Sequence, residues 1–253
     1  MTPSLSVVIA VYNEEVSIAY VVDAVLAAVE GFIDYEIIVV NDASTDKTAV
    51  IVEEFVKKNN KIRVIHNPKN MNWGYSLCEG VRVATKNYVC MLPGDGDILP
   101  DAFKLILRSV GKRDLVLAYH GNSTVRVWLR RFVSSLFIHM MNALFGLQLR
   151  YYNGPCIFPT ERLKQWGVKT YGFAYIAELV VLFLKDRKHR TTYLEVPMMI
   201  RPERKGANLQ VFRPWNFLGV LKTIVSLFWR VQIVTLIKGI FNFAGDKFKL
   251  FQS

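Results

Sequence analysis

The run Tyr88-Val89-Cys90-Met91-Leu92-Pro93-Gly94-Asp95-Gly96-Asp97 joins a short apolar segment to two carboxylates that stand one residue apart. Its apolar part has the length and composition of a buried β-strand. Carboxylates at positions i and i+2 can converge on one hard cation, and Mg²⁺ or Mn²⁺ held there could bind a substrate diphosphate. Taken alone, such a run is more often a solvated Gly/Asp turn, so the sequence upstream has to decide between the two interpretations.

On both sides of this run, short apolar segments, the first two rich in Val and Ile, alternate with segments of helical periodicity. The expected strands cover residues 5–11, 36–40, 63–66, 88–92 and 115–119, and the expected helices cover 14–29, 47–58, 73–84 and 101–110. Strands that are apolar on both faces and alternate with helices predict an α/β fold, in which helices flank a mostly parallel sheet. Ligands of such sheets gather beyond the carboxyl ends of the strands.

Polar clusters follow the first two expected strands. The first is Tyr12-Asn13-Glu14-Glu15 and the second is Asn41-Asp42-Ala43-Ser44-Thr45-Asp46. Both fit helix N-termini, with Asn13 as a cap in the first and Ser, Thr or Asp opening the helix in the second. Asp42 precedes the cap, where a carboxylate could accept hydrogen bonds from a base or a ribose.

In this order, the two clusters, Asn72-x-Gly74 with Gly80 and Ala84, and Asp95-x-Asp97 resemble glycosyltransferase family 2. Members of that family have the GT-A fold, which is Rossmann-like, and use nucleotide-activated sugars. Residues 171–179, 193–197 and 201–206 look like the second half of the polyprenyl-phosphate glycosyltransferases, the relatives of dolichyl-phosphate mannose synthase. The resemblance covers residues 5–210.

The resemblance implies roles for individual residues. Asp95 and Asp97 match the metal-binding pair, Asp97 being the more direct ligand, and Glu178 matches the glutamate of the acceptor-side helix. We count these three as the candidate catalytic residues. The expected nucleotide-sugar site consists of Ala10, Tyr12, Glu14, Asn41, Asp42, Asn72, Gly74 and Gly96. The expected phosphate and acceptor contacts are Arg130, Arg131, Arg201, Arg204 and Lys205, the last three in a basic loop.

Four positions depart from the family pattern. Asn41 stands where the family often has a first aspartate, and Leu99 stands where close relatives commonly have Gln, which leaves the third protein ligand open. Tyr119-His120 occupies the place of a usual Arg, and Asn153-Gly154 replaces an acidic residue and its small neighbours. Of the four histidines, none pairs at a ligand spacing, and His120 alone is a candidate for the donor phosphates.

Charge divides the chain into unlike halves. Residues 1–123 carry 12 Lys/Arg and 15 Asp/Glu, a net charge of −3, whereas residues 124–253 carry 20 and 6, a net charge of +14. Cations spaced through Leu, Ile, Phe and Trp are typical of helices on a membrane surface and not of a nucleic-acid patch, so we expect an anionic membrane surface as partner and no nucleic acid. The halves suggest a GT-A domain over 1–210, with a nucleotide-sugar half (1–123) and an acceptor half (124–210).

Two apolar segments carry the membrane hypothesis. Residues 125–149 have apolar side chains at helical intervals after Arg126, Arg130 and Arg131, which fits a membrane-dipping helix or an ordinary core helix. In the expected amphipathic helices of 211–253, Lys222, Arg230 and Lys238 recur at intervals of eight, so no stretch reaches the roughly 18 uncharged residues that a bilayer crossing needs. These helices would lie in the interface, or pack on the sheet or on another subunit of a homo-oligomer.

The three cysteines lack metal-ligand and redox spacing, which predicts buried free thiols in a reducing compartment. Residues 1–10 lack a basic region before an apolar one, so we expect no signal peptide and a cytoplasmic location, peripheral on the inner face of the membrane.

The sequence thus predicts an inverting, metal-dependent glycosyltransferase that moves a sugar from a UDP- or GDP-linked donor to a polyprenyl or dolichyl phosphate. One alternative is a family-2 transferase that uses a glycan hydroxyl as acceptor and Glu178 as base. The other is a noncatalytic module that docks on membranes; the departures from the family pattern at Asn41 and Leu99 leave this alternative open.

Overall fold

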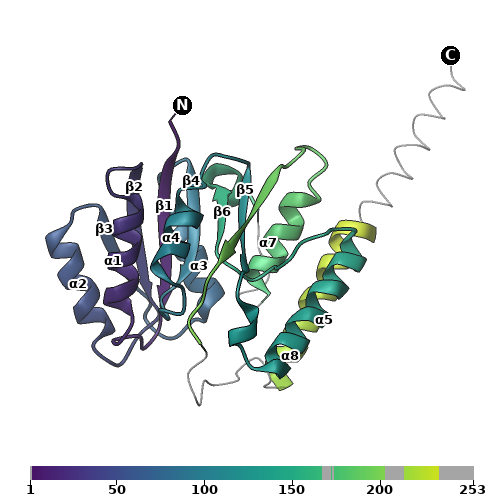
Figure 1. Ribbon diagram of the computed structural model, residues 1–253, viewed down its shortest axis with the longest axis horizontal. Helices are drawn as coiled ribbons and strands as arrows, with labels where there is room; N and C mark the ends of the chain where they lie inside the picture. The colour runs from purple at the N-terminus through teal and green to yellow at the C-terminus, as the bar shows by residue number, and fades with distance from the viewer. Residues whose placement is uncertain (1, 167–171, 173, 203–213, 234–253) are drawn as a thin grey trace, which may run out of the picture.

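The computed structural model describes residues 2–166, 172, 174–202 and 214–233, and for 214–217 and 232–233 it describes the backbone (Figure 1). Within these residues, seven strands form one sheet in the order β3-β2-β1-β4-β6-β5-β7. Neighbours are parallel except β6, which runs antiparallel to β4 and β5. The strands are β1 (Ser4–Val11), β2 (Asp34–Asn41), β3 (Ile62–His66), β4 (Tyr88–Pro93), β5 (Leu115–His120), β6 (Cys156–Pro159) and β7 (Tyr193–Met198). The predicted α/β fold with a mostly parallel sheet is confirmed.

Helices cover both faces of the sheet (Figure 1). On one face lie α1 (Ile18–Val29), α2 (Thr48–Lys58) and α4 (Pro100–Leu107). The opposite face carries α3 (Trp73–Val83), α5 (Trp128–Phe145), α6 (Thr160–Lys164), α7 (Tyr175–Leu184) and α8 (Pro214–Phe228). A 3₁₀ turn, η1 (Ser123–Val125), precedes α5, and a π-helical turn, η3 (Trp229–Ile233), follows α8.

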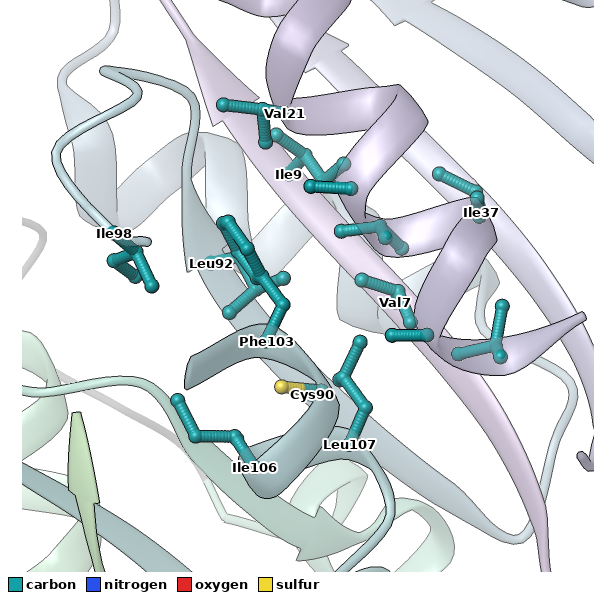
Figure 2. Close-up of a cluster of buried hydrophobic side chains, with 14 of the residues drawn as sticks. Val7, Ile9, Val21, Ile37, Cys90, Leu92, Ile98, Phe103, Ile106 and Leu107 are labelled. Carbon is teal, nitrogen blue, oxygen red and sulfur yellow. The ribbon is translucent and has the colours of Figure 1, made fainter. Parts of the chain in front are cut away.

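Two apolar cores result, because side chains alternate along each strand. Val7 and Ile9 of β1 belong to the core under α1 and α4, and Val8 belongs to the core on the other face. Figure 2 shows the first core, in which Phe103 of α4 lies close to Leu92 of β4. Burying one such side chain contributes about 1.5–3 kcal/mol, so β1 and β4 are held firmly and their carboxyl ends are fixed in place.

The expected elements agree with the structure except at some boundaries. The first helix begins at Ile18 and not at residue 14, because the carbonyl of Glu14 accepts the amides of Ser17 and Ile18 in a separate turn. Asn13 is not its cap: its backbone is left-handed, with φ of 55°, and its Oδ1 accepts from the Thr45 amide instead. The helix expected over 101–110 ends at Leu107.

Cysteines follow the prediction in part. Cys90 and Cys156 are buried free thiols, whereas Cys78 is free but only partly buried. Burial raises the pKa of Cys90 and Cys156 well above the ordinary thiol value.

Helices α5 and α8 lie side by side at one end of the sheet (Figure 1). Their carboxyl ends meet, with the rings of Phe145 and Phe228 6.4 Å apart. α8 buries Ile224 and Leu227 against the core, so it packs on the protein along one side. No helix within the described ranges has both the length and the apolar composition needed to span a bilayer.

At the amino ends of the strands, Glu36 of β2 joins several segments. Its carboxylate accepts hydrogen bonds from Ser6 Oγ (2.6 Å), from the amide and hydroxyl of Thr85 (2.6 and 2.9 Å) and from Arg63 (2.8 Å). Burial alone would raise the pKa of Glu36, but these hydrogen bonds and the Arg63 charge outweigh it and lower the pKa below the ordinary value of 4.5. This cluster is far along the strands from the polar loops described below, so its role is in stability.

We expect Glu36→Gln to lower the free energy of unfolding at pH 7 by about 1–3 kcal/mol, since it removes charge from several hydrogen bonds. A depressed pKa stabilises the fold above the unfolded-state value of 4.5, and that stabilisation is lost as pH falls through the folded-state value. The difference between wild type and Glu36→Gln should therefore shrink below pH 4.5. Urea unfolding from pH 7 to 3 measures it, with the exposed Glu54→Gln as control; a difference that stays constant with pH would contradict the assignment.

Candidate active site

The loops after β1 and β2 hold each other at the carboxyl edge of the sheet. The Asn13 amide donates to Ser44 Oγ (2.9 Å), the Thr45 amide donates to Asn13 Oδ1 (2.8 Å), and the Glu14 amide donates to Thr48 Oγ1 (2.8 Å). Both Asn13 and Ala43 have left-handed backbone, with φ of 55° and 59°. Such conformations persist when surrounding contacts over-determine them, and they cluster at functional sites. These contacts hold the predicted site residues Tyr12 and Glu14 beside the end of β2.

Asp42 is buried behind these loops. Its Oδ1 accepts hydrogen bonds from Asn67 Nδ2 (2.6 Å) and from the Met71 amide (2.9 Å), and Asn67 also donates to Ser76 Oγ (2.9 Å). Asp42 therefore joins the end of β2 to the segment that leads into α3. At the amino end of α3, Asn72 is exposed with φ of 76°, and Gly74 is buried.

Asn41, the departure from the usual aspartate, is also bound within the protein. Its Oδ1 accepts from the Ser44 amide (3.1 Å) and its Nδ2 lies 3.0 Å from His66 Nδ1. An amide can make both contacts because it carries a donor and an acceptor, whereas a carboxylate could not donate to the ring.

The carboxylate pair lies directly beyond β4. The Gly94 amide donates to the carbonyl of Ala10 (3.1 Å), which ties the turn to β1, and the Asp97 amide donates to Asp95 Oδ1 (3.1 Å). Gly96 has φ of +71°, and an added Cβ would stand 2.8 Å from Ser17 Cβ, so only glycine fits between the two carboxylates. Asp97 is exposed and Asp95 is partly buried.

Negative charge is concentrated at Asp95. Burial, the neighbouring Asp97 and the more distant Glu14 raise its pKa to about 6, against smaller opposing effects of the hydrogen bond from the Asp97 amide and of the Arg130 charge. Among the described residues, no three acidic, His or Cys side chains gather closely enough to hold a metal by themselves. Mg²⁺ is commonly bound by one or two carboxylates together with substrate phosphates and water, and the excess negative charge at Asp95 and Asp97 fits that kind of site.

Arg201 approaches the carboxylate pair from the segment after β7. Its amide donates to the carbonyl of Asp97 (2.8 Å), and its guanidinium lies 4.2 Å from the centre of the Tyr20 ring. Tyr20 in turn donates to the carbonyl of Ile98 (2.8 Å). The predicted basic loop thus begins next to the carboxylates, whereas Arg204 and Lys205 lie outside the described residues.

Further cations come from the start of α5. Arg126 Nη1 lies 2.9 Å from His120 Nε2, and the centres of the His120 and Tyr151 rings are 4.4 Å apart, with the ring planes tilted by 56°. Burial, and then the charges of Arg126 and Arg130, lower the pKa of His120 to about 3, so this ring is neutral at pH 7. The Arg130 charge lowers the pKa of both Asp95 and His120, which places Arg130 near both side chains. The first turn of α5 therefore lies at the same edge of the sheet as the carboxylate pair. Arg131, the other predicted contact, is exposed.

Glu178 lies in the first turn of α7 and its side chain is only 3% exposed. Its Oε1 accepts a hydrogen bond from Arg230 of η3 at 2.5 Å, and its Oε2 has no hydrogen-bond partner among the described residues. The interval of eight residues in the sequence brings Lys222 and Arg230 near one face of an expected helix. In the structure the two do not share a surface, since Lys222 is exposed whereas Arg230 is partly buried and reaches Glu178. Arg230 follows the buried Leu227 by three residues, a spacing that places both on one side of a helix.

Several of these contacts were missed from the sequence. Arg230 as partner of Glu178, Asn67 behind Asp42 and Tyr20 under Arg201 each join segments that are 25 or more residues apart. No local motif marks such pairs, although the excess of Arg in the second half was a signal for Arg230.

A mostly parallel sheet with nucleotide-type loops and an acidic pair at its carboxyl edge defines the GT-A class of transferases. The fold agrees with the crystal structure of glucosyl-3-phosphoglycerate synthase from Mycobacterium tuberculosis in complex with UDP, with a TM-score of 0.66, 20% identity, and coverage of 89% of this chain and 80% of that one. The same enzyme with Mn²⁺, UDP-glucose and phosphoglyceric acid gives a TM-score of 0.65. At this identity the likeness shows the fold.

The family follows from sequence similarity. Glycosyl transferase family 2 matches residues 6–164, and the chain belongs to this family. It is 32% identical over 122 residues to a poly-beta-1,6-N-acetyl-D-glucosamine synthase of Staphylococcus epidermidis, covering 48% of this chain and 29% of that protein. It is 29% identical over 157 residues to the dolichyl-phosphate beta-glucosyltransferase ALG5C of Trichomonas vaginalis, covering 55% of this chain and 46% of that protein. The chain thus spans less than half the length of these curated relatives.

Proposed function

We propose that this chain transfers a sugar, with inversion, from a UDP- or GDP-linked donor to a polyprenyl or dolichyl phosphate at the cytoplasmic face of a membrane. The observation that carries the proposal is the double character of α5. Its first turn brings Arg130 to the edge where Asp95 lies, and the same helix exposes Trp128, Phe132 and Leu136, which are 71%, 61% and 61% exposed. A molecule that meets both features has an anionic head and an apolar tail.

Exposed apolar residues continue onto α8. The outward side of this helix carries Leu218, Leu221 and Val225, and Trp229 follows at its end. We call this outward surface of the two helices the apolar face; its residues are Trp128, Leu129, Phe132, Leu136, Leu218, Leu221, Val225 and Trp229. Exposed apolar patches of this kind mark contacts with membranes or proteins, and flanking cations such as Arg131 and Lys222 favour an anionic lipid surface.

In the proposed reaction, a phosphate oxygen of the lipid bonds to the anomeric carbon in line with the bond from that carbon to the donor diphosphate, which breaks and leaves as a nucleoside diphosphate. A phosphate monoester is already anionic at pH 7, its second pKa being about 6, so no side chain has to remove a proton from it. Arg126, Arg130 and Arg201 orient the two anionic substrates and offset their repulsion.

The donor half positions the nucleotide. We assign Tyr12, Glu14 and Asp42 to the nucleoside, since the loops after β1 and β2 hold all three at one edge. Mg²⁺ or Mn²⁺, held by Asp95 and Asp97, would supply positive charge to the departing diphosphate. A complex of the glucosyl-3-phosphoglycerate synthase with Mg²⁺ and UDP supports this choice of cation.

The alternative acceptor is a glycan hydroxyl with Glu178 as base, and the name of the glucosamine-polymer synthase favours it. The ion pair with Arg230 speaks against it, because Glu178 already shares its charge with a guanidinium. The name of the ALG5C relative favours the lipid phosphate.

We expect purified protein with Mn²⁺, radiolabelled UDP- or GDP-sugars and a polyprenyl phosphate to form an organic-soluble labelled product. The product should release its sugar in mild acid, because a glycosyl phosphate is acid-labile. A polyprenol without phosphate serves as the matched control and should remain unlabelled. Label transferred only to glycan oligomers would support the hydroxyl acceptor, and binding of lipid without transfer of any sugar would support a noncatalytic module.

A further inference from the structure

The ion pair between Glu178 and Arg230 joins two elements with different tasks. Glu178 comes from α7, in which every residue from Tyr175 to Phe183 is buried, and Arg230 comes from the turn at the end of α8. The Arg230 side chain is 25% exposed, so it extends from the surface to the buried Glu178 carboxylate. The pair therefore fastens the outer helix to the core by charge.

Apolar packing alone would not fix α8 at one position on the core, because other apolar contacts could take the place of those it makes. Ile224 and Leu227 are buried, but Val225 and Trp229 on the other side are exposed and belong to the apolar face. Trp229 and Arg230 are consecutive in the chain, so a displacement of Trp229 would also displace the Arg230 guanidinium. A membrane or protein that binds Trp229 of the apolar face would thus contact the residue next to Arg230, the partner of Glu178.

A buried carboxylate needs its partner. Without Arg230, the Glu178 carboxylate would be an uncompensated group in the interior, which is strongly unfavourable. Docking of the α8–η3 segment and burial of the charged form of Glu178 are consequently linked, and such linkage is reciprocal.

The donor loops do not share this linkage. Asn13 and Ser44 are bound to each other, and Asp42 is joined to α3 through Asn67; within the described residues no hydrogen bond joins these three to α8 or η3. A change at Arg230 should leave nucleotide-sugar binding in place.

We propose that Arg230 is a positioning residue for the acceptor step: it pairs with the buried Glu178 carboxylate and fixes α7 against α8, so that docking of the apolar face is coupled to the acceptor side of the site. This inference rests on the proposed function, in which Glu178 lies on the acceptor side. Arg230 touches neither substrate, and it acts through Glu178.

The test compares Arg230→Met, Arg230→Lys, Glu178→Gln and the double variant Glu178→Gln/Arg230→Met. The matched control is Arg82→Met, which removes an exposed ion pair to Glu79 at 3.1 Å. We expect Arg230→Met to raise the KM for polyprenyl phosphate at least tenfold while the Kd of the donor with Mn²⁺ stays within twofold. Arg230→Lys should restore most of the loss, and Arg82→Met should match wild type.

A second readout does not require turnover. Amide hydrogen exchange in Tyr175–Leu184 should be faster in Arg230→Met, and the double variant should be less affected than the sum of the single ones, because each single change leaves one buried group unpaired. Additive effects on exchange, an unchanged KM for the acceptor, or an equal loss of donor and acceptor binding would overturn the inference. If wild type transfers no sugar to lipid phosphate, the proposed function fails, while the exchange measurement still decides whether Arg230 and Glu178 are coupled.

Discussion

Asp97→Ala should reduce kcat for sugar transfer by at least about 1,000-fold without unfolding the protein. Removing a group that stabilises charge developing in a transition state typically costs about 10²–10³ in rate, and loss of a metal ligand removes the contribution of the cation as well. The fold should survive because the Asp97 side chain is exposed and its contacts to Asp95 and Arg201 run through its backbone amide and carbonyl.

The control for this experiment is Asp101→Ala. Asp101 is an exposed carboxylate in the first turn of α4, four residues further along the chain. Its removal should leave turnover near that of wild type. Near-normal turnover of folded Asp97→Ala would remove the metal hypothesis, and circular dichroism with thermal unfolding establishes that both variants are folded.

The second large effect is on membrane binding. Trp128→Ser/Phe132→Ser should weaken binding to anionic vesicles by about 10²–10⁴-fold, since each side chain contributes about 1.5–3 kcal/mol when it leaves water. Both side chains are more than half exposed, so the free energy of unfolding should change little. Co-sedimentation with phosphatidylglycerol and phosphatidylcholine vesicles measures the binding.

This substitution is cleaner than deletion of residues 215–253. Deletion would also strip Ile224 and Leu227 from the core and leave Glu178 without Arg230, so loss of binding could reflect unfolding. Leu105→Ser, on the exposed side of α4, is the control for a lost apolar side chain elsewhere. Unchanged sedimentation of the double variant would show that the apolar face is not the membrane contact.

The sequence predicted the first half of the fold well because its strands and helices are local patterns. Apolar runs such as 5–11 and 89–92 are buried on both faces, and the helices between them show the 3.6-residue period. β6 was not predicted, because it has only four residues and is recognisable only through its antiparallel pairing with β4 and β5. That pairing depends on Gly154, where an added Cβ would meet the Ala118 carbonyl at 2.1 Å.

The candidate site was predictable where residues sit directly after strands. Asp95, Asp42 and Glu14 lie at one edge because parallel strands bring their carboxyl ends together. Long-range partners were not predictable, and Arg230 is the main example: its spacing from Lys222 and Lys238 suggested one shared helical face, whereas in the structure its guanidinium pairs with Glu178, 52 residues earlier in the chain. Charge balance in the interior, which decides this contact, leaves no periodic signal.

The acidic pair after β4 should make donor binding depend on a divalent cation. Calorimetric titration of wild type and Asp97→Ala with UDP- and GDP-sugars, each with and without Mn²⁺, tests it most directly. We expect wild type to bind one donor class, and to bind it only when Mn²⁺ is present. A donor at 100 times its Kd should stabilise the fold by about 2.7 kcal/mol, and Asp97→Ala should lose both effects. Equal donor binding with and without Mn²⁺, or unchanged binding by Asp97→Ala, would contradict it.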